Sequence, residues 1–155
     1  MRKITHLVVH HVGSMPAGFP VENPVPTIRA WHTDPNKPGG PFADIAYQKL
    51  ITPAGAVKQG RADGIPGAHA YGANANTIGV LIVADGDAGP IPPAQRKATV
   101  QTLAILARRH GVPVANIIGH CDVARLFPGG ASSACPGKFI TADLPAIRAE
   151  VAGLI

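Results

Sequence analysis

The stretch TIGVLIVA, residues 77–84, is nearly all apolar and rich in β-branched side chains. A strand that is buried on both faces of a sheet has this composition, because neither face then needs polar side chains. We therefore expect residues 77–84 to form a central strand that other elements cover on both sides.

Patterns on either side of this stretch predict further strands and helices. Alternating or β-branched runs predict strands at residues 4–10, 45–52, 56–59 and 114–119. Helical spacing of apolar residues predicts helices at residues 27–32, 92–110 and 141–154. This order of elements predicts an α/β fold, in which one domain over residues 1–155 has a central mixed β-sheet flanked by helices.

Local signals set several boundaries of these elements. A Pro-Ala-Gly turn at residues 53–55 predicts a hairpin between two of the strands. Prolines precede the helix at 92–110, and Gly111 follows it as a stop. Thr141 is placed to cap the last helix.

The composition favours a globular protein with an anionic partner. Hydrophobic residues make up 46% of the 155 residues and charged residues 15%, which excludes a disordered tail. The net charge of +5 favours nucleic acid or an anionic cell wall. Because the basic residues are scattered and aromatic residues make up only 5%, no nucleic-acid partner is expected.

The N-terminus and the hydropathy bear on where the protein acts. No apolar run approaches the roughly 20 residues that a membrane-spanning helix needs, so no stable membrane insertion is expected. The opening residues MRKI lead directly into a predicted strand without the apolar core of a signal peptide. We therefore expect that the protein is synthesised in the cytoplasm. We also expect a monomer.

Candidate metal ligands lie at the ends of two predicted strands and in a later loop. His10 and His11 end the first strand, His120 ends another, and Cys135 lies fifteen residues beyond it. Imidazole and thiolate are ligands that zinc prefers, and three protein ligands with one open position form a catalytic site. Because side chains alternate along a strand, His10 and His11 point in opposite directions, and periodicity does not say which one is the ligand.

Two other interpretations of these residues stay open on spacing alone. A disulfide between Cys121 and Cys135 would consume the proposed thiolate. Scattered histidines are also common as surface residues or as hydrogen-bonded core residues, and the spacing matches no local zinc motif.

Several segments occur in a family-like order between about residues 4 and 140. They are LVVHH at 7–11, IRAWH at 28–32, DIAY at 44–47, GAHA at 67–70 with NANTIGV at 74–80, and IGHCD at 118–122 with ACPG at 134–137. This series resembles the type 2 N-acetylmuramoyl-L-alanine amidases, a family that includes coliphage amidase-type lysozymes and animal peptidoglycan recognition proteins.

The resemblance implies a zinc hydrolase that cuts the amide between N-acetylmuramic acid and L-alanine of peptidoglycan. It implies one Zn²⁺ held by His10, His120 and Cys135, which leaves His11 a structural role. Tyr47 resembles the catalytic tyrosine of the family. Ser133 stands where several phage amidases carry lysine and some animal amidases carry threonine, so it is expected to be a weaker auxiliary donor.

The resemblance also implies where the substrate binds. His69, Asn74 and His32 are expected to contact it. Asn74 also suits a turn, His69 a loop held by its backbone, and His32 the packing of its helix. Asp122 is expected either to orient a ligand imidazole or to cap its loop.

The expected biological role is that of a phage endolysin, which reaches the cell wall after release from the cytoplasm. A peptidoglycan-binding receptor without catalysis remains an alternative, as does a regulatory binding protein.

Overall fold

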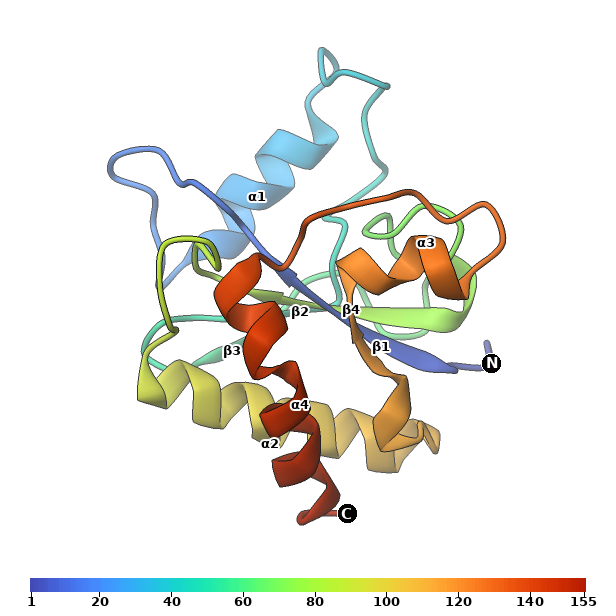
Figure 1. The fold of residues 1–155 in the computed structure, drawn as a ribbon. Helices are drawn as coiled ribbons and strands as arrows, with labels where there is room; N and C mark the ends of the chain where they lie inside the picture. Colours follow the sequence, from blue (N-terminus) through green and yellow to red (C-terminus); the bar gives the residue numbers. More distant parts are fainter.

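A five-stranded mixed sheet in the order β3-β2-β4-β1-β5 forms the centre of the computed structural model, which describes all 155 residues (Figure 1). The strands are β1 (His6–His11), β2 (Lys49–Ile51), β3 (Val57–Gln59), β4 (Thr77–Ile82) and β5 (Ile117–Gly119). Only β3 runs antiparallel to its neighbour β2, across the predicted hairpin. Every residue of β4 is buried, which confirms the predicted central strand.

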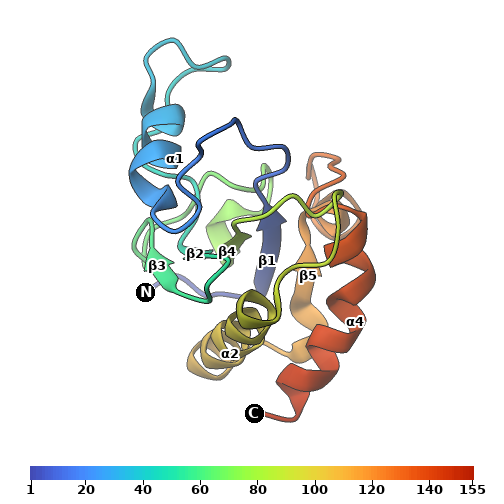
Figure 2. The same cartoon turned by 90° about the vertical axis from the view of Figure 1, so that its left-hand side faces the viewer.

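Four α-helices surround the sheet. They are α1 (Pro24–Thr33), α2 (Pro93–His110), α3 (Val123–Leu126) and α4 (Lys138–Ala152). Figure 2 shows α2 and α4 on one side of the sheet and α1 on the other. None of the helices combines the length and the apolar character that a membrane crossing requires. The α/β fold with a mixed sheet is therefore as predicted.

The two faces of β1 pack in different hydrophobic clusters. Leu7 and Val9 belong to a 19-residue core cluster that also contains the inward-facing residues of α2 and α4. Val8 belongs to a separate small cluster, and His10 shares its side of the strand. The predicted alternation therefore holds, and His10 points away from the main core.

Parallel pairing of β1 with β5 brings two histidines to one edge of the sheet. Val9 pairs with Gly119, so His10 and His120 occupy the next position on adjacent strand ends. His120 begins the 3₁₀ turn η3 (His120–Asp122), which directly follows β5. The carboxyl edge of the sheet is thus where these imidazoles meet.

The start of α4 differs from the prediction. The helix begins at Lys138, so Thr141 lies inside it, and the prediction that Thr141 is the cap is wrong. The carboxylate of Asp87, from a distant loop, accepts a hydrogen bond from the amide of Lys138 at 2.9 Å. A cap from another part of the chain leaves no local sequence signal, which explains the error.

The strand predicted at 45–52 is shorter than expected because a side chain replaces part of the backbone pairing. Gln48 donates its backbone amide to the carbonyl of Gly79 at 3.1 Å. Its side-chain oxygen accepts the amide of Gly79 at 2.8 Å. The chain before Lys49 is therefore attached to β4 without forming a regular strand.

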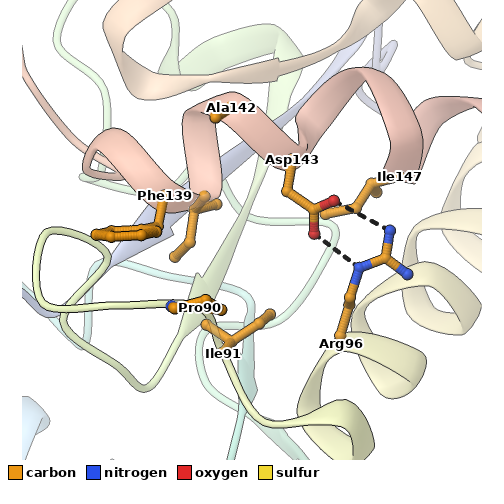
Figure 3. Close-up of a pocket in the computed structure, with 8 residues that line it drawn as sticks. Pro90, Ile91, Arg96, Phe139, Ala142, Asp143 and Ile147 are labelled. Carbon is orange, nitrogen blue, oxygen red and sulfur yellow. Dashed lines mark hydrogen bonds and ion pairs between the residues drawn. The ribbon is translucent and has the colours of Figure 1, made fainter.

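An ion-pair cluster ties α2 to α4. Arg96 of α2 donates two hydrogen bonds to Asp143, at 2.7 and 3.1 Å (Figure 3). It also pairs with Glu150 at 2.7 Å. The Arg96–Asp143 pair borders a largely apolar hollow of about 410 Å³, whose other walls include Pro90, Ile91 and Phe139. This hollow shares no residue with the predicted ligands.

Candidate metal centre and active site

His10, His120 and Cys135 converge at the carboxyl edge of the sheet. One ligand atom from each lies within 4.8 Å of the others. Nδ1 of His10 is 3.6 Å from Sγ of Cys135, and the rings of His10 and His120 are 4.7 Å apart between centroids. The structure therefore brings together the three residues that the sequence predicts as ligands.

Burial keeps both imidazoles of this cluster neutral. The pKa of His10 is lowered well below its ordinary value by burial and then by the nearby His69, and burial also lowers the pKa of the half-buried His120. A neutral imidazole has a free lone pair, which is the form that binds a metal. Both histidines are therefore in the neutral form that can bind a cation at neutral pH.

The thiol of Cys135 needs a cation to ionise. Burial raises the pKa of Cys135 to about 12, and a hydrogen bond from the backbone amide of His11 to the sulfur opposes this shift. Two neutral imidazoles with a sulfur that a cation would convert to thiolate match the ligand set of zinc. The residues present therefore fit one Zn²⁺.

The side chain of His11 has a structural partner outside this cluster. Its Nδ1 accepts a hydrogen bond from the amide of Gly86 at 2.8 Å. Asp85 and Asp87 lie close enough to form a second group with His11, but each carboxylate also accepts a backbone amide. These contacts are those of an ordered loop, and His10 is the member of the histidine pair that faces the ligand cluster.

Both cysteines are free, so the structure does not contain the alternative disulfide. Cys121 instead donates its backbone amide to the carbonyl of Cys135 at 2.7 Å. This bond holds the Cys135 loop against the segment that carries His120.

Tyr47 lies beside the ligand cluster as a protonated phenol. Its ring packs edge-on against that of His10, with 5.1 Å between centroids. Burial and the nearby Cys135 raise the pKa of Tyr47, so its hydroxyl remains a hydrogen-bond donor at neutral pH. His32 holds the same segment, because its Nδ1 accepts the amide of Ala46 at 3.0 Å and its ring is 5.7 Å from that of Tyr47.

Two predicted residues hold the backbone next to a ligand. Ser133 Oγ accepts the amide of Cys135 at 3.1 Å, which leaves its hydroxyl proton available. Asp122 accepts the amide of Gly119 at 3.0 Å, just before His120, so it caps its loop, which is the second of the two roles expected for it.

His69 and Asn74 lie at the inner side of the centre. His69 is only 6% exposed, and its Nδ1 is 2.9 Å from Nε2 of His10. The side-chain oxygen of Asn74 accepts the amides of His69 and Ala70, both at 2.9 Å. Asn74 is therefore the turn former that its residue type suggests, and its side-chain NH₂ remains free.

Sequence reasoning missed Arg61, which organises the segment that carries Tyr47. Its guanidinium donates to the carbonyls of Asp44, Ile45 and Pro66 at 2.8–2.9 Å, and it is almost fully buried. A single arginine in a polar loop gives no sequence signal for such a role.

Comparisons with known proteins identify a family and relatives of this chain. The family described as N-acetylmuramoyl-L-alanine amidase matches residues 1–138. A peptidoglycan-recognition protein of Drosophila simulans is 30% identical over 142 residues, which cover 89% of this chain and 71% of that protein. The endolysin of Enterobacteria phage K11 is 31% identical over 131 residues, which cover 75% of this chain and 78% of that protein.

A solved structure supports the fold independently. The N-acetylmuramoyl-L-alanine amidase LysC from Clostridium intestinale superimposes with a TM-score of 0.75 at 19% identity, over 97% of this chain and 87% of that one. Likeness at this identity shows the fold alone, whereas the family match covers the ligand cluster and the Tyr47 segment. The chain therefore belongs to the N-acetylmuramoyl-L-alanine amidase family.

Proposed function

We propose that the protein is a zinc-dependent amidase that hydrolyses the bond between N-acetylmuramic acid and the L-alanine of peptidoglycan. Residues 1–155 would form its catalytic domain. The observation that carries the proposal is the convergence of His10, His120 and Cys135 beside the protonated hydroxyl of Tyr47. A binding protein without catalysis has no need for this donor set.

The division of work among the side chains follows from their charge states. Zinc, when bound, supplies a Lewis acid that polarises the scissile carbonyl and lowers the pKa of a water molecule. His10 and His120 would hold it as neutral ligands, and Cys135 would supply the one negative charge. Tyr47 would donate a hydrogen bond to the negative charge that develops on the carbonyl oxygen of the substrate.

Three further residues have free polar groups for the substrate or the reaction. Ser133 keeps its hydroxyl proton, Asn74 its side-chain NH₂, and His32 its Nε2, since the other atoms of each are engaged with backbone amides. We assign Ser133 to the auxiliary donor role and the other two to substrate contacts. The burial of His69 favours its contact with His10 over a contact with the substrate.

The biological role that fits best is lysis of a bacterial cell wall. The endolysin of phage K11 is a relative of this chain, and the net charge of +5 favours attraction to an anionic wall. We propose that the protein is made in the cytoplasm, acts on the wall after release and works as a monomer. The similarity to a peptidoglycan-recognition protein keeps a non-catalytic receptor as the second candidate.

Digestion of purified sacculi separates the two candidates. The zinc-loaded protein should release the α-amine of L-alanine and the lactyl carboxylate of muramic acid, each identified by mass spectrometry of the soluble products. EDTA should abolish the release, and added zinc should restore it. Binding to sacculi without new amines would overturn the amidase and favour the receptor.

A further inference from the structure

The two ring nitrogens of His10 face different partners. Nδ1 points to Sγ of Cys135 at 3.6 Å, on the side where a metal would bind. Nε2 points to Nδ1 of His69 at 2.9 Å. A neutral imidazole carries one proton, so an unprotonated Nδ1 requires the proton to be on Nε2. That proton then needs an acceptor, and Nδ1 of His69 is in the correct place.

Thr77 extends this chain of hydrogen bonds beyond His69. If Nδ1 of His69 accepts, its Nε2 carries the proton and lies 3.4 Å from Oγ1 of Thr77. Thr77 in turn donates its hydroxyl to the carbonyl of Ala73 at 2.9 Å. The chain ends on a carbonyl, which can only accept. A single arrangement of protons therefore satisfies every link, and it leaves Nδ1 of His10 free for a metal.

Two glycines leave room for the ring of His69 in this orientation. A Cβ added at Gly79, on β4, would lie 2.6 Å from Cγ of His69, and one added at Gly67 would lie 2.5 Å from its Cδ2. Real Cβ atoms do not approach so closely, so only glycine at both positions leaves space for the ring. Asn74 also holds the backbone amide of His69.

We infer that His69 is a positioning residue for the metal centre: it accepts the Nε2 proton of His10 and so holds His10 with its Nδ1 lone pair toward His120 and Cys135. This role rests on the zinc site of the proposed function. The positioning role requires no contact between His69 and the substrate. It also explains why glycine occupies positions 67 and 79, where a Cβ would clash with the His69 ring. Partners that orient ligand histidines in this way typically change metal affinity by about 10- to 100-fold.

The zinc dissociation constants of two variants test the inference. Asn and Leu have the same branching and nearly the same size, but only His69→Asn keeps an acceptor close to the position of Nδ1. We expect His69→Leu to weaken zinc binding by about 10- to 100-fold and His69→Asn to recover most of that loss. Competition with a chromophoric chelator measures both, and circular dichroism shows that each variant is folded. Equal weakening in both variants would reduce His69 to a packing role and overturn the inference.

A second measurement uses the unaltered protein without metal. Long-range ¹⁵N–¹H NMR spectra identify which nitrogen of each imidazole carries the proton. The inference requires His10 and His69 both to be protonated on Nε2, and a proton on Nδ1 of His10 would overturn it. This readout depends on neither turnover nor zinc. The two proposals can fail separately. If sacculi remain undigested while NMR shows His10 protonated on Nε2, the proposed amidase activity is contradicted and the positioning role of His69 stands.

Discussion

The backbone amide of His11 donates a hydrogen bond to the sulfur of Cys135 at 3.4 Å. The two neighbouring histidines therefore approach this sulfur in different ways, since His10 brings its side-chain Nδ1 to 3.6 Å and His11 donates its backbone amide. A backbone donor stabilises negative charge on the sulfur and opposes the burial that raises the pKa of Cys135. The sulfur is therefore held where a cation would turn it into a thiolate ligand.

Cys135 and Cys121 should differ sharply in their effect on zinc. Cys135→Ser removes the sulfur ligand and should lower zinc affinity by more than about 100-fold, beyond the usual effect of residues that only orient a ligand. Cys121→Ser should retain one zinc per chain, because Cys121 contacts the Cys135 loop through its backbone. Elemental analysis after dialysis measures both. Loss of zinc from the Cys121 variant, or a disulfide in active protein, would contradict the ligand assignment.

Tyr47→Phe should separate catalysis from metal binding. The variant keeps the ring that packs on His10 but loses the hydroxyl, so we expect a full complement of zinc and a kcat about 10²-fold lower. The matched control is Tyr71→Phe, since Tyr71 is 77% exposed and should keep the original rate. An unchanged kcat in the Tyr47 variant would remove Tyr47 from the mechanism.

The metal-free protein should lose stability as the pH falls below about 6.5, the ordinary pKa of histidine. Burial lowers the pKa of all seven histidines, that of His69 to about 3. The unfolded chain then binds more protons than the folded one, so acid favours unfolding. Each buried histidine, His10 and His69 above all, contributes at most about 1.4 kcal/mol per pH unit to the slope of the unfolding free energy against pH.

Urea unfolding of the metal-free protein at pH 7.5 and pH 5 measures this slope. The His69→Asn variant provides the control. Its free energy of unfolding should depend less steeply on pH, because unfolding exposes one histidine fewer and so takes up at most one proton fewer. Equal free energies of unfolding at the two pH values would mean that the buried histidines are already accessible to protons in the folded state.

Gln95 should stabilise the attachment of α2 to the sheet. Its side-chain NH₂ donates to the carbonyls of Ile51 and Val83 at 2.8 and 3.0 Å in a fully buried position. Gln95→Ala removes these bonds and should lower the free energy of unfolding by about 2 kcal/mol. Gln101→Ala, at an exposed position of the same helix, should change it little. Equal effects of the two substitutions in urea unfolding would show that this attachment is unimportant.

The sequence predicted the elements whose signals are local. The apolar run of β4 and the proline and glycine that bound α2 lie within or beside the elements themselves, and both predictions are confirmed. Strand alternation limited the ligand to one of His10 and His11, but the choice between them required the family resemblance. The structure places His10 at the cluster through the pairing of Val9 with Gly119.

Features that depend on distant contacts could not be predicted in this way. Asp87 caps α4 from 51 residues away, and Gln48 replaces strand pairing with its side chain. His69 lies 2.9 Å from His10, which is 59 residues away in sequence, and no local pattern predicts that contact. The glycines beside His69 were part of the family-like segments, but their packing against the ring is visible only in three dimensions.

Zinc K-edge X-ray absorption of the zinc-loaded protein tests the proposed metal centre most directly. The ligands His10, His120 and Cys135 predict one sulfur at about 2.3 Å and two imidazole nitrogens at about 2.0–2.1 Å, with a light atom completing the shell. A shell of nitrogen and oxygen without sulfur would contradict the account.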